Sequence, residues 1–194
     1  FKVAVCEQTE DPKHAKGVVK REVVQVITPG TIMEGKTLDG KTNHFIAAAE
    51  QLSQNEIAFV YLDVSTGEAN TSIIEGSAKE LTQQLQAYAI KEVIVTEQLQ
   101  LLMADYAETS GIVLSLEQQE MDVTRAAQYV KDLPKQLQAV AKRLLQYVER
   151  TQMRSLSHIQ AFTFTEANSY LRIDTNSKRN LELIQSIRGG DAKG

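Results

Sequence analysis

Residues 57–75, IAFVYLDVSTGEANTSIIE, carry the strongest structural signal in the chain. The halves 57–65 and 67–75 are both rich in β-branched and aromatic residues, which favour extended backbone. The dipeptide Thr66-Gly67 lies between them, and a glycine at that place allows the chain to reverse direction. The pattern predicts a β-hairpin, around which the neighbouring segments can be placed.

A helix is expected directly after the hairpin. Ser77 and Glu80 have the spacing of a capping box, in which the side chain of each residue bonds the backbone N–H of the other. Apolar residues then recur at three- and four-residue steps, the period of an amphipathic helix. We therefore predict a helix over residues 78–89.

The pattern continues with a strand at 92–96, a helix at 97–109 and a strand at 111–116. We expect the helix at 97–109 to face the core with three apolar residues, Leu101, Leu102 and Tyr106. Strands that alternate with helices in this way predict an α/β domain, in which a mixed sheet carries helices on its faces.

The flanking segments complete the predicted organisation. Residues 21–28, REVVQVIT, predict a strand that ends at Pro29-Gly30. Residues 31–43 have the composition of a linker, and residues 44–52 fit either a short strand or a helix. A long amphipathic helix is expected from Pro134. The predicted segments are an N-terminal part (1–30), a linker (31–43), the α/β domain (44–133) and a helical part (134–194).

The composition indicates a globular chain. Its 194 residues are 42% hydrophobic, and no apolar run reaches the roughly 20 residues that a membrane helix needs. Cys6 is the single cysteine, so no internal disulfide can form and we expect a reducing, cytoplasmic location. The chain opens at Phe1 without an initiator Met and closes on a Gly-rich polar tail, so we expect a piece of a longer protein.

Charge is distributed unevenly along the chain. Residues 1–43 hold 7 basic and 6 acidic groups (+1), residues 44–133 hold 4 and 14 (−10), and residues 134–194 hold 10 and 5 (+5). Nucleic acids are bound through cations that release condensed counterions. The central segment is therefore a poor candidate for a nucleic-acid surface and a better candidate for contact with protein.

Asp63 is the strongest enzymatic candidate, because a carboxylate at the centre of a sheet can hold a catalytic metal ion. Such a site needs further carboxylates, and the spacing of Glu68, Glu75 and Asp105 does not indicate that they converge. We favour a structural Asp63 that accepts backbone N–H groups near residues 65–67. A metal-dependent, ribonuclease H-like nuclease that uses Asp63 is the alternative.

Other residue types give no site by their spacing. His14, His44 and His158 lack the close spacing of a zinc motif, so no shared metal site is expected. Cys6 lies among apolar neighbours and is interpreted as a small buried hydrophobic residue. The chain has no phosphate-binding G-x-x-x-x-G-K-[ST] loop, so no nucleotide site is expected.

Two groups of basic residues could serve DNA binding. We favour solvated surfaces for both, because cationic side chains on an exterior are ordinary. The alternative is contact with the DNA backbone without reading of sequence, for which Lys16, Lys20 and Arg21 are the candidates. The two groups are Lys13, Lys16, Lys20 and Arg21 near the N-terminus, and Lys142, Arg143, Arg150 and Arg154 along the long helix.

Four stretches resemble the MutS family of DNA mismatch-repair proteins. Residues 6–31, CEQTEDPKHAKGVVKREVVQVITPGT, resemble the end of that family's mismatch-binding domain. FVYLDVSTGE at 59–68 resembles the opening hairpin of its connector domain. TQMRSLSHI at 151–159 and DTNSKRNLELIQSIRGG at 174–190 resemble the start of its core domain. The resemblance implies a ribonuclease H-like connector with flanking helices, followed by the start of a helical core domain.

The resemblance also implies a role. In this family the connector relays ATP-dependent rearrangement and presents a surface to the partner MutL. Phe1-Lys2-Val3 is not the family's Phe-x-Glu wedge, and its ATPase site lies far downstream. We therefore expect a non-catalytic piece without cofactor. ATP, Mg²⁺, mismatched duplex DNA and homodimer formation would belong to the full-length protein. By similarity the MutL surface lies near a helix that begins at Thr124, with Arg125, Ala127 and Gln128.

Overall fold

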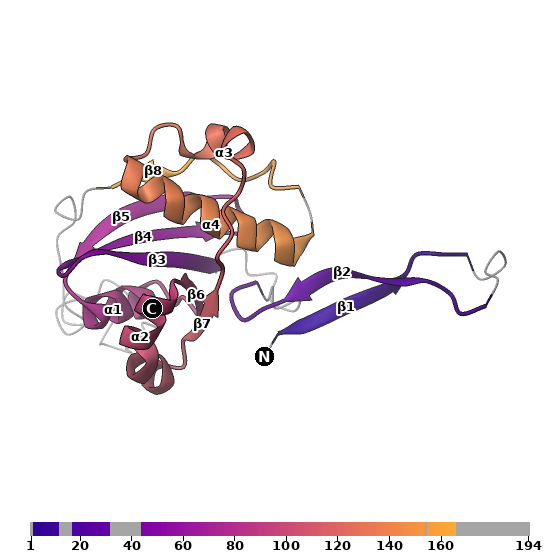
Figure 1. The fold of residues 1–194 in the computed structure, drawn as a ribbon, viewed down its shortest axis with the longest axis horizontal. Coiled ribbons are helices and arrows are strands. Elements are labelled where there is room, and N and C mark those ends of the chain that lie inside the picture. The colour runs from indigo at the N-terminus through magenta and orange to yellow at the C-terminus, as the bar shows by residue number, and fades with distance from the viewer. Residues whose placement is uncertain (1, 12–16, 32–43, 154, 166–194) are drawn as a thin grey trace, which may run out of the picture.

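The computed structural model describes residues 2–11, 17–31, 44–153 and 155–165. Within them, a two-stranded ribbon precedes a body in which one sheet lies between two pairs of helices (Figure 1). In chain order, the elements are β1 (Val3–Gln8), β2 (Arg21–Ile27), β3 (Phe45–Ser53), β4 (Glu56–Asp63), β5 (Ala69–Glu75), α1 (Ala78–Ala87), β6 (Glu92–Val95), α2 (Glu97–Ser110), β7 (Val113–Leu116), α3 (Val123–Val130), α4 (Lys135–Gln152) and β8 (Thr163–Phe164).

The large sheet is mixed and has the strand order β7-β6-β3-β4-β5-β8. β3, β4 and β5 are antiparallel neighbours, whereas β6 and β7 run parallel to β3. β4 and β5 form the predicted hairpin, and the segment at 44–52 is a strand and not a helix. The expected α/β fold with a mixed sheet is confirmed.

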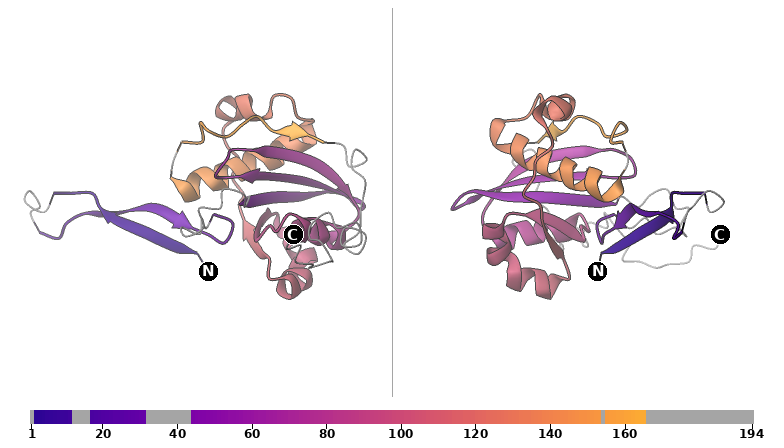
Figure 2. Two further views of the ribbon diagram at one scale, coloured as in Figure 1. Left: turned by 180° about the vertical axis from the view of Figure 1, so that it is seen from behind. Right: turned by 45° about the vertical axis from the view of Figure 1, so that its right-hand side comes forward.

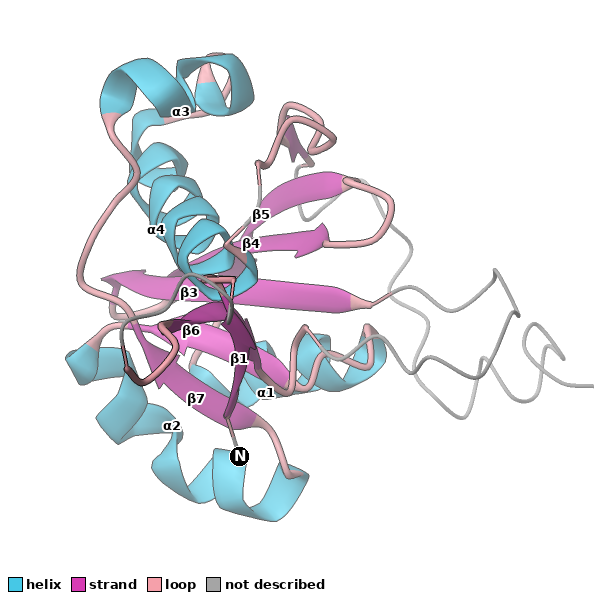
Figure 3. Cartoon of the chain, turned by 90° about the vertical axis from the view of Figure 1, so that its right-hand side faces the viewer, coloured by secondary structure: helices cyan, strands magenta, loops and turns pink. Residues whose placement is uncertain are grey.

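Helices cover both faces of the sheet, as predicted (Figure 3). α1 and α2 pack on one face and α3 and α4 on the other. β3 shows why both faces are closely covered: Ile46 and Ala48 belong to the α4 side, and Ala47 and Ala49 to the α1 side. Successive strand residues point to opposite faces, and a buried run of small residues lets both layers approach the backbone.

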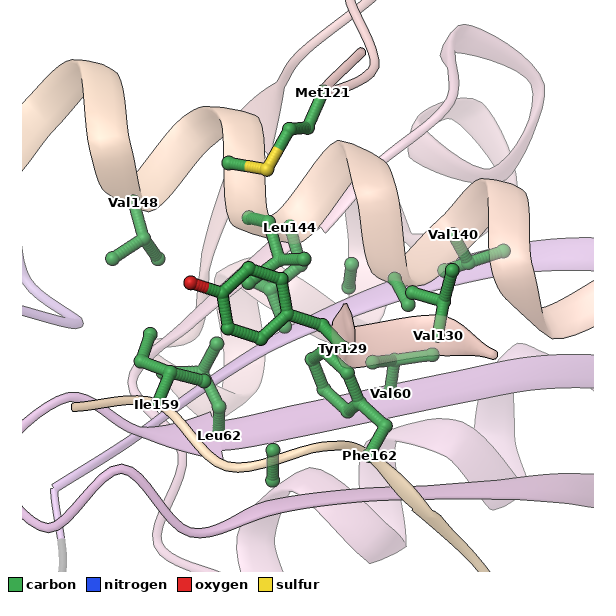
Figure 4. Packing of buried hydrophobic residues seen from close by; sticks show 14 of the residues in the cluster. Val60, Leu62, Met121, Tyr129, Val130, Val140, Leu144, Val148, Ile159 and Phe162 are labelled. Atoms are coloured by element: carbon green, nitrogen blue, oxygen red, sulfur yellow. The ribbon is translucent and has the colours of Figure 1, made fainter. Parts of the chain in front are cut away.

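α4 packs against strands β3 and β4 of the sheet (Figure 4). We expected this helix to open a helical part separate from residues 44–133. Its apolar stripe instead shares one hydrophobic cluster with Val60 and Leu62 of β4 and Tyr129 of α3. The sequence showed the stripe but not the surface that buries it. α4 therefore belongs to the same folded body as the sheet.

The prediction for the buried face of α2 was wrong. Leu101, Leu102 and Tyr106 are all exposed, Leu101 to 80%, whereas Leu99 and Met103 are fully buried. Apolar residues lie on more than one side of this helix, so periodicity alone could not select its inner face.

The ribbon of β1 and β2 extends away from the body (Figure 2). Its strands pair antiparallel, with Val3 opposite Ile27 and an irregularity between Val5 and Cys6. Cys6 is exposed, so its interpretation as a buried residue was wrong for this structure. Linker residues 32–43 and the stretch 174–190 lie outside the described residues.

Candidate functional site

The residues proposed as a partner surface lie together on α3. The helix is capped by Asp122, whose carboxylate accepts the N–H groups of Thr124 at 2.9 Å and Arg125 at 3.3 Å. Its inner face, with Ala126, Tyr129 and Val130, is buried against the core. The outer residues Thr124, Arg125, Ala127 and Gln128 are all exposed. The amphipathic pattern of α3 thus leaves one continuous outer face.

Arg125 is tied to the neighbouring helix. Its guanidinium forms an ion pair with Glu149 of α4. The buried Tyr129 hydroxyl donates to the backbone oxygen of Leu156 at 3.1 Å, and the Phe162 N–H donates to the backbone oxygen of Tyr129 at 2.8 Å. These bonds hold α3 between α4 and the segment that leads to β8, so its outer face is presented in a fixed orientation.

Three cations of α4 form ion pairs with acidic residues of the body. Arg143 pairs with Glu50 at 2.7 Å, Lys142 with Glu120 at 2.7 Å, and Arg150 with Glu117 at 2.7 Å. The side chains of Lys142 and Arg143 are only 17% and 11% exposed, so the expected solvated surface is wrong for them. Each cation offsets an acidic group of the sheet or of its loops. Arg154 lies outside the described residues.

The N-terminal basic residues are less buried. Lys20 and Arg21 are exposed, and Lys16 lies outside the described residues. The Lys20 ammonium lies 2.6 Å from Glu22, and the hydrogen bond and charge of that carboxylate raise the pKa of Lys20. Lys20 therefore stays charged, but its charge is partly neutralised by its neighbour on β2.

Asp63 organises the turn between β4 and β5. The carboxylate is completely buried, and its Oδ1 accepts the Ser65 N–H at 2.8 Å, the Ser65 hydroxyl at 2.5 Å and the Thr66 N–H at 3.3 Å. Its Oδ2 lies 3.4 Å from the His44 N–H. The predicted structural role is confirmed by these bonds.

Metal-binding residues are not brought together in the described part of the chain. Among those residues, no three His, Cys, Asp or Glu side chains cluster as a cation site. His158 Nε2 lies 2.9 Å from the backbone oxygen of Val64, so it belongs to the same turn region as Asp63. His14 lies outside the described residues.

An open groove beside α2 was not predicted from the sequence. The groove has a volume of about 620 Å³ and is formed by the end of β3, the turn to β4, the start of α1, and one side of α2 from Gln98 to Tyr106. Its lining mixes amide and apolar side chains, including Gln51, Gln98, Leu102 and Tyr106. The exposed face of α2 is thus a second surface that could contact protein.

A buried polar cluster around Glu92 was also missed. Glu92 begins β6 and is fully buried, and its carboxylate accepts hydrogen bonds from the Gly30 N–H, the Ser115 hydroxyl and the Tyr147 hydroxyl. Burial is the main cause that raises the pKa of Tyr147 well above its usual value, and the hydrogen bond to Glu92 raises it further. Its partners are far apart in the sequence, so no local spacing could reveal the cluster.

These features define a mixed α/β domain that carries an N-terminal β-ribbon and exposes the outer faces of α2 and α3. No helix among the described residues is both long and apolar enough to span a membrane. The family model described as MutS domain II matches residues 44–160, and the model described as MutS domain I matches residues 1–36. The chain therefore belongs to the MutS family of DNA mismatch-repair proteins.

Three relatives illustrate the similarity, and each is described as a DNA mismatch repair protein MutS. The protein of Lysinibacillus sphaericus is 66% identical over 194 residues, that of Shouchella clausii 42% over 191, and that of Listeria welshimeri 39% over 199. The alignments cover 97–100% of this chain but only 22–23% of those proteins. The chain thus spans about a quarter of the length of the relatives it matches.

Proposed function

We propose that this chain is the connector of a mismatch-recognition protein, and that it relays conformational change between DNA-binding and ATPase parts. The main observation in support is the match of domain II to residues 44–160, which includes strands β3 to β7 and the helices on both faces of the sheet. The end of domain I, matched at 1–36, joins this body through a buried contact. A relay needs such a mechanical connection at its ends.

We propose a ribonuclease H-like fold for the body, without nuclease activity. The order of three antiparallel strands followed by two parallel strands with helical crossovers supports the fold. The hydrogen bonds that the buried Asp63 carboxylate accepts from the Ser65 and Thr66 N–H groups support a structural use of this side chain. Incubation of the chain with Mg²⁺ or Mn²⁺ and with branched, hybrid or duplex substrates should give no cleavage. Cleavage that is lost in Asp63→Asn would overturn this part of the proposal.

We propose that the outer face of α3 contacts MutL. Thr124, Arg125, Ala127 and Gln128 form an exposed surface, three of whose four residues are polar, on a helix whose opposite face is buried. A rigid helix face can be bound without the entropy cost of ordering a loop. We assign mismatched DNA, homodimer formation, ATP and Mg²⁺ to the full-length protein, and its location to the cytoplasm.

The MutL contact can be tested in the full-length protein by ATP-dependent cross-linking. Ala127→Lys places a long cation on the exposed face of α3, and Ala104→Lys makes the same change on exposed α2, across the sheet. We expect Ala127→Lys to reduce the cross-linked fraction at least fivefold and Ala104→Lys to leave it within twofold. Loss with Ala104→Lys alone would move the contact to the α2 groove. If neither variant reduced the cross-linked fraction, MutL would contact neither the α3 face nor the α2 groove.

Contact with the DNA backbone by Lys20 and Arg21 is a weaker second proposal. Their exposure favours it, and the ion pair of Lys20 with Glu22 opposes it. Binding of duplex DNA to the full-length protein, titrated with salt, should lose about one unit of slope for each phosphate contact removed. A slope unchanged in Lys20→Gln and Arg21→Gln would exclude both residues.

A further inference from the structure

One carboxylate joins the ribbon to three parts of the body. Glu92 Oε2 accepts the Gly30 N–H at 2.8 Å, and Oε1 accepts the Ser115 and Tyr147 hydroxyls at 2.6 Å each. Gly30 lies just after β2, Ser115 on β7 and Tyr147 on α4. Glu92 itself begins β6, so these bonds link the end of the ribbon to both the sheet and α4.

The carboxylate is held by neutral donors. Among the described residues, no Lys, Arg or His forms an ion pair with Glu92. A buried ionised group without hydrogen bonds is strongly disfavoured, and each missing donor has its own energetic cost. Undocking of Gly30 would therefore leave Oε2 without this donor, which favours the docked position of the turn.

The docked turn is closed on itself. The Thr31 hydroxyl oxygen accepts the Thr28 N–H at 2.9 Å, and the Thr31 N–H donates to the Thr28 backbone oxygen at 3.0 Å. Both threonines are buried. A Cβ on Gly30 would meet Glu92 and Ile46 atoms at 3.0 Å, so glycine allows the close approach. The turn thus enters the body as a preformed unit.

Two further contacts seat the ribbon on α4. Lys2 Nζ lies 5.2 Å from the centroid of the Tyr147 ring, and the Gln25 side-chain amide donates to Gln152 Oε1 at 3.2 Å. Beyond these contacts the ribbon extends away from the body (Figures 1 and 2). An isolated two-stranded ribbon is marginally stable, so its direction depends on what holds its base.

We propose that the Thr28–Thr31 turn is an interdomain joint, and that the acceptor oxygens of Glu92 lock it and thereby set the direction of the ribbon. The use of this joint to transmit conformational change rests on the proposed connector role. The presence of the joint does not depend on that role. Displacement of the ribbon would act directly on β6, β7 and α4 through one carboxylate.

Two variants of Glu92, one with an amide side chain (Glu92→Gln) and one with an apolar side chain (Glu92→Met), separate the contribution of hydrogen bonding from that of side-chain volume. In Glu92→Gln, the amide oxygen can accept the Gly30 N–H, and the amide N–H groups can donate to the two hydroxyls, which also act as acceptors. Glu92→Met fills similar space but accepts nothing from Gly30. A joint that depends on hydrogen-bond acceptance survives the first change and not the second.

The orientation of the ribbon can be measured by pulsed EPR on the full 194-residue chain. The native exposed Cys6 on β1 and Leu101→Cys on exposed α2 provide two labelling sites. We expect one narrow distance distribution for the labelled parent and for its Glu92→Gln derivative. The Glu92→Met derivative should give a distribution at least twice as wide, and exchange of the Gly30 amide proton should become at least tenfold faster.

A second variant tests the joint independently, in case Glu92→Met fails to fold. Thr31→Val removes the acceptor of the Thr28 N–H from the turn itself and leaves the sheet unchanged, so it should also widen the distribution. A parent distribution as wide as that of Glu92→Met, or narrow distributions in both Glu92→Met and Thr31→Val, would overturn the joint. Because this measurement uses no MutL, its failure is separate from failure of the cross-linking test.

Discussion

Replacement of Tyr147 with Phe should destabilise the fold more than the same replacement at Tyr129. Both side chains are buried, at 0% and 7% exposure, and each loses only a hydroxyl. The Tyr147 hydroxyl donates to the Glu92 carboxylate at 2.6 Å, whereas that of Tyr129 donates to a backbone oxygen at 3.1 Å. Bonds to charged groups contribute about 1.5–3 kcal/mol and neutral ones about 0.5–1.5 kcal/mol. We expect losses of about 2 kcal/mol for Tyr147→Phe and about 1 kcal/mol for Tyr129→Phe.

The loss of unfolding free energy caused by Tyr147→Phe should also depend on pH. Burial and the bond to Glu92 raise the pKa of Tyr147 in the folded protein above its usual value of 10.0. Above pH 10 the unfolded chain releases this proton while the folded chain keeps it. The free energy of unfolding therefore falls with rising pH, by up to about 1.4 kcal/mol per pH unit. Tyr147→Phe lacks this contribution, so its deficit relative to the parent should shrink above pH 10.

Urea denaturation followed by circular dichroism gives both quantities. The parent, Tyr147→Phe and Tyr129→Phe are compared at pH 8 and at steps from pH 9.5 to 11. Equal losses in the two variants at pH 8 would contradict the assigned bond to a carboxylate. A deficit of Tyr147→Phe that stays constant through pH 11 would contradict the raised pKa of its hydroxyl.

Substitutions at three further positions test local features by the same denaturation measurement. Ser77→Ala removes the N-cap of α1, with bonds to Lys79 and Glu80, and should cost about 1 kcal/mol; a change below a few tenths would show that the cap is not needed. Asp63→Ala removes the charged acceptor of the part-buried Ser65 and Thr66 N–H groups and should cost about 2 kcal/mol, with Asp63→Asn milder; equal costs would contradict the acceptor role. Gly67→Ala should cost on the order of 3 kcal/mol, because φ is +79° and a Cβ would lie 2.1 Å from the His158 oxygen; a neutral result would exclude this packing.

Features set by near neighbours could be predicted from the sequence. The capping box of Ser77 and Glu80 needs residues three apart, and the role of Asp63 needs only the turn that follows it. The hairpin is likewise a contact between adjacent segments. In each case the residues that satisfy the backbone lie within a few positions of each other, so their spacing carries the information.

Features set by distant segments could not be predicted. α2 has apolar residues on several sides, and only the packing of Leu99 and Met103 against the sheet selects its inner face. Glu92 lies in a short apolar strand, 62 residues from Gly30 and 55 from Tyr147. A lone acidic residue in a buried strand is the signal that could have been noticed, because a buried carboxylate requires donors.

The structure also changes how the charge of the central segment should be counted. α4 packs on the sheet, and its four basic and one acidic residues between 134 and 153 raise the sum of −10 for residues 44–133 to −7 for residues 44–153. Three of these cations, Lys142, Arg143 and Arg150, pair with Glu120, Glu50 and Glu117, so these acidic groups beside α4 are largely neutralised. Asp105 and Glu108 on α2 stay exposed on the opposite side of the sheet. These exposed carboxylates on α2 would repel DNA phosphate, because like charges repel. A partner that binds close to DNA should therefore contact the α3 face and not the α2 face.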